Sequence, residues 1–399
     1  MTEKNKSIRN FPTLRFQGFE GEWESNKLGN LLEFKNGINA SKEQYGKGVK
    51  FINVLDILNN DFITYENIVG KVDVDKTIIE KFSVQYGDVL FQRSSETREE
   101  VGTANVYLDK ENNATFGGFV IRGKKIGNYN PIFFNKLLKT SSARDSITSK
   151  SGGSTRFNVG QEILSSIVLY FPSLTEQDKI ADFLSLVDNR ISTQKKIIKE
   201  LKSLIKSSRE KIFSQKLKFR TVNEINFSNW EIKKIRDLFE IKKGEQLNKD
   251  DLNDAGSYPC LNGGISFSGY TEKFNSEENT ITISEGGNSC GYVNFMITKF
   301  WLGGHCYKII VNENASKEYF YHLLKYNESK IMNLRVGSGL PNIQLKDLKN
   351  LNIFVSNDFE EQIQIANFLS SIDEKIETEK KILTQYETQK KYLLANIFV

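Results

Sequence analysis

One stretch of sequence occurs twice in this chain, 185 positions apart, and it determines how the whole chain is organised. The first occurrence, Glu176 to Asp188, is EQDKIADFLSLVD. The second occurrence, Glu361 to Asp373, is EQIQIANFLSSID. A repeat at a fixed spacing is typical of a duplicated structural unit, and two similar halves arrange most simply about a pseudo-twofold axis. The sequence therefore predicts a tandem duplication.

The duplication extends upstream of both stretches. The matching segments are Trp23-Glu24 with Trp230-Glu231 at an offset of 207, Asn53 with Asn262 at 209, and Phe116-Gly117-Gly118-Phe119 with Leu302-Gly303-Gly304-His305 at 186. The fall from 209 to 186 places about 23 extra residues in the first copy, between Asn53 and Gly117. Each copy is thus a globular segment followed by a long segment that begins with Glu-Gln.

Length and composition agree with this division. A chain of 399 residues exceeds the usual limit for one hydrophobic core, and 38% hydrophobic residues suffice for two. We predict a first globule over 1–175, a long helix over 176–219, a second globule over 220–357 and a long helix over 358–399. There is no apolar run of membrane-spanning length and no secretion signal, so we expect a cytoplasmic protein with no membrane partner. Three cysteines, an odd number, favour reduced thiols: Cys260, Cys290 and Cys306.

The two long segments carry apolar residues in alternating steps of four and three, the spacing of a coiled-coil seam. We expect the two helices to pair with each other in antiparallel orientation, which brings the polar seam residues Gln194 and Glu379 together. The residues predicted to pair in the first helix are Ile180, Leu184, Val187, Ile191, Gln194, Ile198 and Leu201. Those in the second helix are Ile365, Leu369, Ile372, Ile376, Glu379 and Leu383.

Charge favours this pairing. Residues 176–219 hold 11 basic and 6 acidic residues, whereas residues 358–399 hold 5 basic and 8 acidic residues, so the two helices have opposite net charge. Two alternatives remain open from the sequence. Each apolar stripe could pack on its own globule, or the helices could form a coiled coil between molecules.

The globular segments have the pattern of short strands with a few small helices. Strands are predicted at 51–55, 88–91, 119–122 and 167–171, where β-favouring residues lie between Gly, Asn and Asp. Short helices are predicted at 131–139 and 317–325. The predicted fold class is α+β, with two similar globules of mixed sheet and small helices separated by the two long helices.

Known signatures of catalysis are missing from the sequence. It has no phosphate-binding loop, no dinucleotide fingerprint and no cysteine pairs at metal-ligand spacing. We expect His305 to be a half-buried structural residue and His322 an exposed helix position. We therefore predict no catalytic residues and no metal site, and the chain has the pattern of a binding protein.

Loops rich in Gly, Ser, Asn and Arg recur in both copies, and this composition suits contact with nucleic acid. Arginine can bind guanine with two hydrogen bonds, Asn and Gln can bind adenine, and glycine lets the backbone approach phosphate. Such loops also simply turn the chain, and a net charge of +5 permits DNA binding without requiring it. The candidate DNA-binding residues are Arg93, Ser94, Ser95, Thr97, Arg98, Thr155, Arg156, Asn158, Asn262, Gly286, Asn288, Ser289, Asn342 and Gln344.

Two globules, each followed by Glu-Gln-x-x-Ile-Ala-x-Phe-Leu-Ser-x-x-Asp and a long heptad helix, resemble the DNA specificity subunit of type I restriction-modification systems. The segments that begin at Trp23 and Trp230, and the runs 87–94 and 342–348, share this resemblance, which covers roughly residues 11–399. It implies two target recognition domains, each binding one half of a split site in double-stranded DNA. It also implies that the paired helices fix the gap between the half-sites.

The resemblance further implies partner subunits that perform the chemistry. Two modification (methyltransferase) subunits would methylate adenine with S-adenosylmethionine, and restriction (translocase/nuclease) subunits would use ATP and Mg²⁺ to translocate and cleave. This chain would bind none of these cofactors. One departure is that the second copy has Glu285-Gly286-Gly287 where the first has Arg93, so its contacts must differ. The competing classes are a coiled-coil adaptor without DNA specificity and an enzyme with an unrecognised site.

Overall fold

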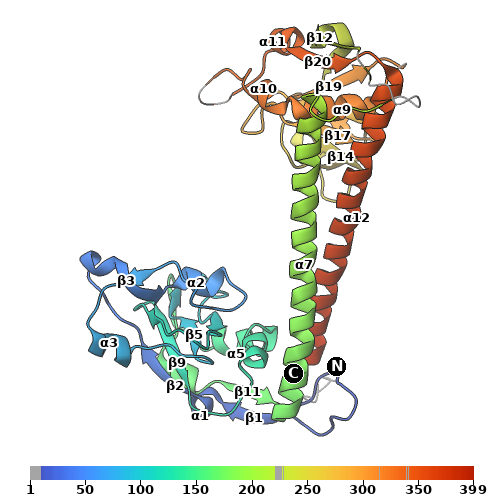
Figure 1. Cartoon of the computed structure of the whole chain (residues 1–399). Helices are drawn as coiled ribbons and strands as arrows, with labels where there is room; N and C mark the ends of the chain where they lie inside the picture. Colours follow the sequence, from blue (N-terminus) through green and yellow to red (C-terminus); the bar gives the residue numbers. More distant parts are fainter. Residues whose placement is uncertain (1–9, 221–226, 228, 314, 338, 340) are drawn as a thin grey trace. The chain divides into compact units, whose positions relative to one another are not determined.

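The computed structural model describes residues 10–220, 227, 229–313, 315–337, 339 and 341–399. The predicted first and second globules therefore include residues outside this description, at 1–9 and at 221–226, 228, 314, 338 and 340. The chain divides into two units. The first unit comprises Met1–Thr193 and Leu383–Val399, and the second comprises Gln194–Ile382. Each unit thus contains one globule and parts of two long helices (Figure 1).

The globule of the first unit alternates short strands and short helices. In chain order these are β1 (Glu24–Lys27), α1 (Leu28–Leu31), β2 (Leu32–Asn36), η1 (Lys42–Gln44), β3 (Tyr45–Ile52), α2 (Val54–Leu58), β4 (Lys71–Val72), α3 (Lys76–Lys81), β5 (Val89–Gln92), β6 (Ser94–Ser95), β7 (Ala104–Val106), β8 (Thr115–Phe116), β9 (Val120–Lys125), α4 (Pro131–Leu137), α5 (Ser141–Thr148), β10 (Phe157–Asn158), α6 (Gln161–Ser165) and β11 (Val168–Phe171).

A four-stranded antiparallel sheet of order β2-β9-β5-β7 lies at the centre of this globule. Every residue of β5 is buried, because the strand has a neighbour on each side and is covered on both faces. A second sheet has the order β4-β3-β8. Strand β1 pairs with β11, which joins the start of the globule to its end immediately before the first long helix. The strands of the globule are therefore all in place before the chain continues into the first long helix.

The globule of the second unit repeats this plan. Its elements are β12 (Trp230–Lys234), α8 (Ile235–Leu238), β13 (Phe239–Lys243), η2 (Lys249–Asp251), β14 (Tyr258–Leu261), β15 (Gly269–Thr271), β16 (Thr280–Ser284), β17 (Val293–Met296), β18 (Trp301–Leu302), β19 (Cys306–Val311), α9 (Lys317–Tyr326), α10 (Glu328–Met332), α11 (Leu345–Asn350) and β20 (Asn352–Ser356).

The three sheets of the second globule repeat three sheets of the first, and the pairing of β6 with β10 is matched by a single bridge between Gly286 and Asn342. The orders β13-β19-β16-β17, β15-β14-β18 and β12-β20 repeat β2-β9-β5-β7, β4-β3-β8 and β1-β11. The extra residues predicted for the first copy include helices α2 and α3, which have no counterpart between β14 and β16 in the second. The duplication deduced from sequence is therefore a duplication of topology.

The predicted strand at 51–55 is wrong in its second half. Strand β3 ends at Ile52 and helix α2 begins at Val54. The backbone N–H of Asn53 donates to the carboxylate of Asp56 at 2.8 Å, so these two residues cap the helix start. This local capping overrides the β propensity of Val54. The helices predicted at 131–139 and 317–325 are confirmed as α4 and α9.

The two long helices are α7 (Leu174–Phe213) and α12 (Phe359–Ile397). Helix α7 ends six residues before the predicted limit of 219. Gln215 has a φ of 61°, a left-handed conformation that cannot continue a helix, and the N–H of Leu217 donates back to the carbonyl of Lys211 at 2.9 Å. The end of α7 is thus fixed by a backbone reversal that the apolar pattern does not signal.

Within each unit the two helices are antiparallel neighbours (Figure 1). In the second unit, Gln194 hydrogen-bonds Glu379, and further along α7 Arg209 bonds Asp373 at 3.0 Å, earlier in α12. In the first unit, Lys390 bonds Asp188 at 2.7 Å. The predicted pairing residues are buried, except for Leu201, Glu379 and Leu383, which are partly exposed.

The apolar stripe has two partners at once. In the first unit, Ile180 and Leu184 of α7 belong to one buried cluster with Phe133 and Phe171 of the globule and with Leu393 of α12. In the second unit, a corresponding cluster combines α12, α7 and the second globule. Packing against the globule and packing between helices are therefore not alternatives here. In each unit one cluster thus joins the globule to both helices, beside smaller buried clusters within the globule.

The repeated Glu-Gln pair has a structural role at the start of each long helix. All four side chains are buried. The amide of Gln177 donates to the carbonyl of Pro172 at 3.0 Å, and that of Gln362 donates to the carbonyl of Ser356 at 2.8 Å. Each glutamine thus anchors the helix to the end of the preceding strand, which explains why both copies keep this pair.

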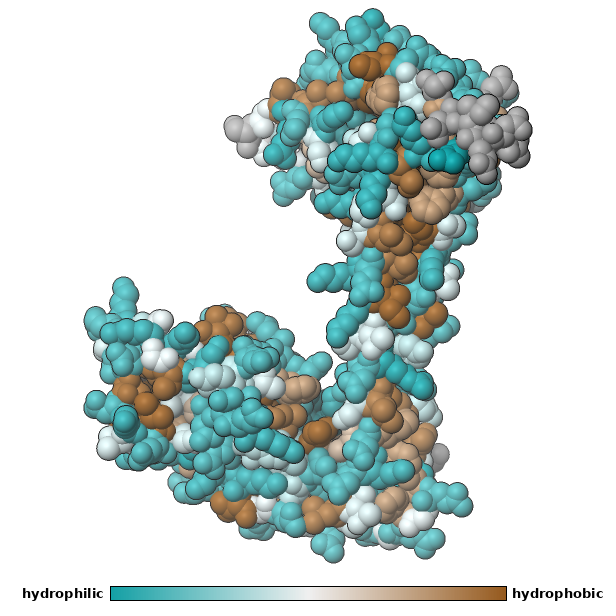
Figure 2. Space-filling model, viewed as in Figure 1, coloured by the Kyte–Doolittle hydropathy of each residue, from teal (hydrophilic) through white to brown (hydrophobic). Residues whose placement is uncertain are grey.

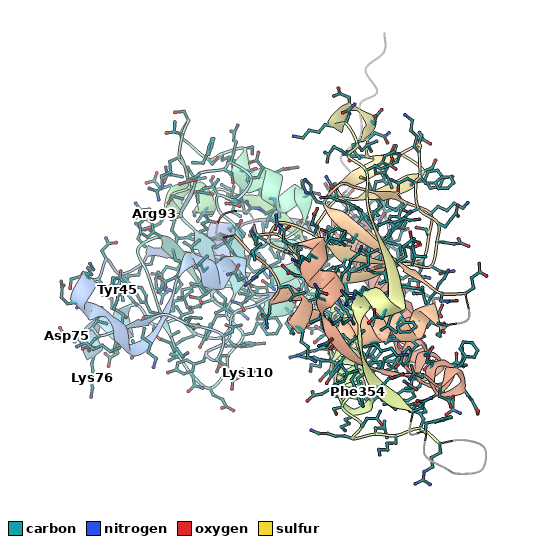
Figure 3. All side chains as sticks on the ribbon, turned by 90° about the horizontal axis from the view of Figure 1, so that it is seen from above. Tyr45, Asp75, Lys76, Arg93, Lys110 and Phe354 are labelled. Carbon is teal, nitrogen blue, oxygen red and sulfur yellow. The ribbon has the colours of Figure 1, made fainter. Side chains whose placement is uncertain are left out.

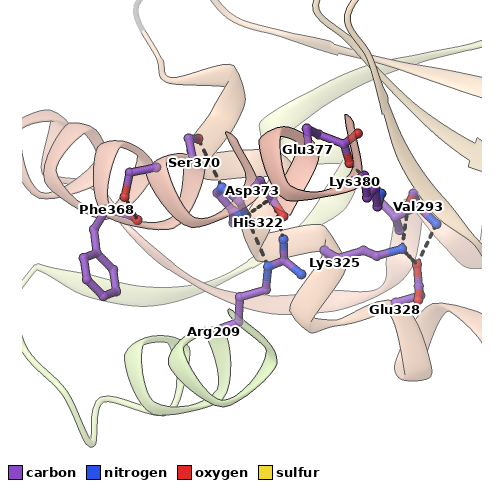
Figure 4. Close-up of polar contacts among 11 residues, drawn as sticks. Arg209, Val293, His322, Lys325, Glu328, Phe368, Ser370, Asp373, Glu377 and Lys380 are labelled. Atoms are coloured by element: carbon purple, nitrogen blue, oxygen red, sulfur yellow. Dashed lines mark hydrogen bonds and ion pairs between the residues drawn. The ribbon is translucent and has the colours of Figure 1, made fainter. Parts of the chain in front are cut away.

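The prediction that His322 is exposed is wrong, because its side chain is fully buried between α9, α7 and α12 (Figure 4). The guanidinium of Arg209 donates to Nδ1 of His322 at 3.2 Å. Nδ1 is therefore an acceptor, and the ring proton lies on Nε2, which faces Ser370 Oγ at 3.3 Å. Burial and the Arg209 charge lower the pKa of His322 to about 2, so the ring is neutral.

The corresponding position in the first unit holds Lys136, which is also buried. Its ammonium forms an ion pair with Asp188 of α7, and Lys390 of α12 joins the same carboxylate. Asp188 and Asp373 are equivalent residues of the repeat. In both units an acidic residue of one long helix thus meets a basic residue of the other helix and a side chain of the adjoining globule.

Candidate nucleic-acid interface

Two of the predicted loops of the first unit lie side by side. Strand β6 pairs with β10, so that Ser94 lies opposite Asn158. The N–H of Val159 donates to the carbonyl of Arg93 at 3.0 Å. These hydrogen bonds join the loop that follows β5 to the Gly/Ser loop that precedes β10. Two loops that are far apart in the sequence therefore lie next to each other and form one surface.

A third segment, the Gly117-Gly118 turn, completes this surface. The N–H of Arg93 donates to the carbonyl of Phe119 at 2.9 Å, and its guanidinium donates to that of Gly118 at 3.4 Å. The guanidinium carbon of Arg156 lies 5.8 Å from the centre of the Phe119 ring. We call Arg93, Ser94, Phe119, Arg156 and Asn158 the first loop surface. Figure 3 shows Arg93 at the margin of the first unit.

This surface has the chemistry of a nucleic-acid contact. The side chains of Arg93, Phe119, Arg156 and Asn158 are exposed, which places two guanidinium groups, an aromatic ring and an amide within reach of a ligand. The amide of Asn158 also donates to the carbonyl of Arg156 at 3.0 Å. Guanidinium groups bind phosphate or guanine, and the amide of asparagine can bind adenine. The first loop surface can thus supply both backbone and base contacts.

The other candidates in this unit have different roles. Ser95 is buried and its hydroxyl donates to Glu100 at 2.9 Å, so it holds the loop and does not face solvent. Arg98 is exposed, but its guanidinium donates to the carbonyl of Thr148 at 3.2 Å, at the end of α5. Thr97 and Thr155 are exposed on the same two loops. The structure therefore removes Ser95 from the candidate contacts.

The second unit has the same backbone arrangement at the corresponding place. The N–H of Glu285 donates to the carbonyl of His305, and the N–H of Ile343 donates to that of Glu285, both at 2.8 Å. Gly286 forms a β-bridge with Asn342. Glu285 therefore takes the position of Arg93, and His305 that of Phe119. The two units thus share this pattern of backbone hydrogen bonds, although the side chains that it carries differ.

We call Lys243, Glu285, His305, Asn342 and Gln344 the second loop surface. The ammonium of Lys243 binds the carboxylate of Glu285 at 2.7 Å, and the hydroxyl of Tyr307 donates to the same carboxylate at 2.8 Å. The amide of Gln344 donates to Asn342 at 3.0 Å. This surface contains two amides, an imidazole and a carboxylate paired with a lysine, where the first loop surface has two arginines.

The remaining candidates of the second unit surround this surface. Gly286, Asn288 and Ser289 form the turn after β16, and Asn288 is exposed. Asn262 is only partly exposed, and its side-chain oxygen accepts the backbone N–H of His305 at 3.1 Å. Asn262 thus supports the turn and is a poor candidate for DNA contact. Ser338 and Leu340 of the neighbouring loop lie outside the described residues.

Sequence reasoning missed four members of the two surfaces: Phe119, Lys243, Glu285 and His305. His305 is exposed, so the prediction of a half-buried residue is wrong. The usable signal was the match of Gly117-Gly118 with Gly303-Gly304, because both pairs precede an exposed ring. A tight turn that is followed by an exposed side chain in both copies indicates a residue available to contact a ligand.

The three cysteines lie beneath the surface of the second globule, where the thiol of Cys290 donates to the carbonyl of Glu285 at 2.9 Å. Cys260, Cys290 and Cys306 are free and buried, and burial raises the pKa of the Cys306 thiol to about 11. Among the described residues, no three His, Cys, Asp or Glu side chains are grouped as metal ligands. In the same part of the chain, no helix has the length and apolarity to cross a bilayer.

Comparison with known families agrees with this geometry. The model of the type I restriction modification DNA specificity domain matches residues 20–203 and again residues 227–388. The chain belongs to this family. The two matches coincide with the two copies of the repeat, so the specificity domain is the duplicated unit. This finding supports DNA specificity and gives no support to the adaptor.

Named relatives carry the same description. A putative type I specificity subunit of Mycoplasma genitalium is 38% identical over 154 residues, which span 38% of this chain and 40% of the relative. The chain thus matches less than half the length of that relative. A putative type I restriction enzyme specificity subunit of Methanocaldococcus jannaschii is 25% identical over 411 residues, with 96% of this chain and 95% of the relative covered.

Solved structures show the same fold. The S subunit of a type I restriction-modification system from Mycoplasma genitalium has a TM-score of 0.64 at 19% identity, and the match covers 98% of this chain and 99% of that chain. A chain from a study of complex assembly in the type I system has a TM-score of 0.58 at 15% identity, with 95% and 97% covered. The fold of these S subunits is therefore shared by both units of the chain.

Proposed function

We propose that this chain is the sequence-specific DNA-binding subunit of a type I restriction-modification complex. The first globule binds one half of a bipartite site through the first loop surface, and the second globule binds the other half through the second loop surface. Modification subunits methylate adenine with S-adenosylmethionine, and restriction subunits translocate and cleave with ATP and Mg²⁺. The chain itself recognises the target sequence and catalyses no reaction.

One observation carries this proposal. The two loop surfaces share their backbone hydrogen bonds but present different side chains, with Arg93 and Phe119 in one and Glu285 and His305 in the other. A common frame with different exposed groups suits two modules that bind different sequences in the same geometry. If the loops served only to turn the chain, they would not need to present arginines and amides on one surface.

The long helices provide the connection between the two half-sites in this proposal. Helix α7 is continuous from Leu174 to Phe213 and contributes to both units. Exposed apolar side chains on the helices, such as Leu186 at 63% and Leu204 at 49%, offer docking positions for the modification subunits. Brown side chains are visible on the helix pair in Figure 2.

The test is DNA binding by the complete modification complex. Methylated adenines in the source genome would first define the target, and a mobility shift would then compare the target duplex with a scrambled duplex of the same composition. We expect the complex with this chain to prefer the target by about 1,000-fold or more. Equal binding of both duplexes would favour an adaptor. Methylation by this chain alone would reveal an unrecognised enzyme.

A further inference from the structure

Phe119 is the most exposed phenylalanine of the chain, with 63% of its surface accessible. Three phenylalanines of the same globule, Phe51, Phe91 and Phe116, are by contrast fully buried in its strands. A phenylalanine side chain gains roughly 2 kcal/mol from burial, so this position contributes little to the stability of the fold. The exposed ring of Phe119 therefore indicates a role in binding and not in the hydrophobic core.

The backbone holds this ring outward. A Cβ at Gly117 would lie 3.0 Å from the Phe51 ring, and a Cβ at Gly118 would collide with the side-chain oxygen of Asn39. The carbonyl of Gly117 accepts the N–H of Val120 at 2.8 Å, which closes a tight turn around Gly118 and Phe119. The ring therefore belongs to a short, crowded turn between strands β8 and β9.

The neighbours of the ring are polar. Arg156 approaches its face, and Arg93 is bound to the adjacent carbonyl of Gly118. An arginine over an exposed ring contributes only about 0.5–1 kcal/mol. An apolar group between two arginines matches a DNA base step in the major groove, where thymine presents a methyl group and guanine presents two acceptors.

The second unit has a different group at the same place. His305 follows Gly303-Gly304, and its carbonyl accepts the N–H of Glu285 as that of Phe119 accepts the N–H of Arg93. A Cβ at Gly303 would lie 2.5 Å from the side-chain oxygen of Asn262, and one at Gly304 would lie 3.1 Å from that of Gln246, so this turn is also crowded. An imidazole can hydrogen-bond a base edge, whereas a phenyl ring offers only apolar contact.

We propose that the residue after the Gly-Gly turn determines specificity in each globule, and that Phe119 contacts the 5-methyl group of a thymine in the half-site of the first globule. This inference rests on the proposed function and deepens it. Arg93 and Arg156 then flank that thymine and bind the neighbouring guanine or phosphates. His305 replaces the apolar contact by a hydrogen bond in the other half-site.

Deoxyuridine tests this contact directly, because it differs from thymidine in DNA only by lacking that methyl group. Each thymine of the mapped target is replaced singly, and binding of the complete modification complex is measured. At one position in one half-site, deoxyuridine should weaken binding about fourfold, the effect of one buried methyl group. Phe119→Ala should weaken binding of the thymine duplex and bind both duplexes equally. Phe119→Leu should keep the preference for thymine.

Phe62→Ala is the matched control, since Phe62 is another exposed phenylalanine of the first unit, at 43%. This variant should keep both affinity and thymine preference. The inference is overturned if the wild-type complex tolerates every deoxyuridine, or if Phe119→Ala keeps the full thymine preference. In both cases the target would still be preferred over the scrambled duplex, so the proposed function would stand. Loss of that preference in the wild type would instead overturn the proposed function.

Discussion

The side-chain amide of Gln194 donates to the backbone carbonyl of Glu379 at 3.1 Å and also contacts the Glu379 carboxylate. These two residues are equivalent positions of the repeat, 185 residues apart. In an antiparallel pair of repeated helices, equivalent positions meet at one level along the pair, and this contact marks that level. A polar pair at this point fixes the helix register, since any shift would separate the two side chains.

Changing Gln194 to Leu should destabilise the second unit by about 1 kcal/mol, because Glu379 loses its donor within a seam. The double variant Gln194→Leu/Glu379→Leu should recover that loss, since two apolar residues then meet. Urea unfolding of the four proteins in a double-mutant cycle measures the coupling. Lys196→Leu, at an exposed position of the same helix, controls for added hydrophobicity. Equal stability of wild type and Gln194→Leu would contradict this role.

Removing the acid between two lysines should weaken the first unit. Asp188→Asn leaves buried Lys136 without its ion pair and should cost about 3 kcal/mol at neutral pH. Burial by itself opposes ionisation, but Lys136 and Lys390 bring the pKa of Asp188 below its ordinary value of 3.8. Its contribution is therefore complete above pH 3.8 and is lost as the pH falls further. Acid unfolding should show less pH dependence in Asp188→Asn than in wild type.

His322 should make the second unit sensitive to mild acid. Its pKa is about 2 in the folded protein against 6.5 ordinarily, so the unfolded chain takes up the proton first as the pH falls. Stability should therefore decline below pH 6.5, by about 2 kcal/mol at pH 5. His322→Gln, which can still accept from Arg209, should remove this part of the decline. Thermal unfolding at pH 5 and pH 7.5 compares the two proteins. Parallel pH profiles would show that His322 does not titrate on unfolding.

The three cysteine thiols should resist modification in the folded protein. All three are buried, and the raised pKa of Cys306, about 11, keeps it as the unreactive thiol at pH 8. Titration with a chromogenic disulfide should detect little thiol before denaturation and three thiols afterwards. Rapid reaction of the native protein at pH 8 would place at least one cysteine in an open environment.

Arg93→Ala should weaken recognition of one half-site only, by about tenfold. Asn342→Ala should weaken the other half-site, because it removes an exposed amide of the second loop surface. Binding of duplexes in which one half-site at a time is scrambled separates the two effects. If each variant weakened both half-sites equally, these residues would serve general phosphate attraction or folding instead.

The duplication, the order of globules and helices, and the apolar stripe of each long helix could all be predicted from the sequence, and the antiparallel pairing is the favoured of three arrangements that it allows. Those features depend on periodicity and on repeated local signals, such as Glu-Gln before an apolar stripe, which can be counted along the chain. The folded structure was needed to show that the stripe packs on globule and helix together, that α7 ends at Phe213, and that His322 is buried. It also decided which loop residues meet. Arg93, Phe119 and Val159 are joined by hydrogen bonds between segments far apart in the chain, and no local pattern specifies such contacts.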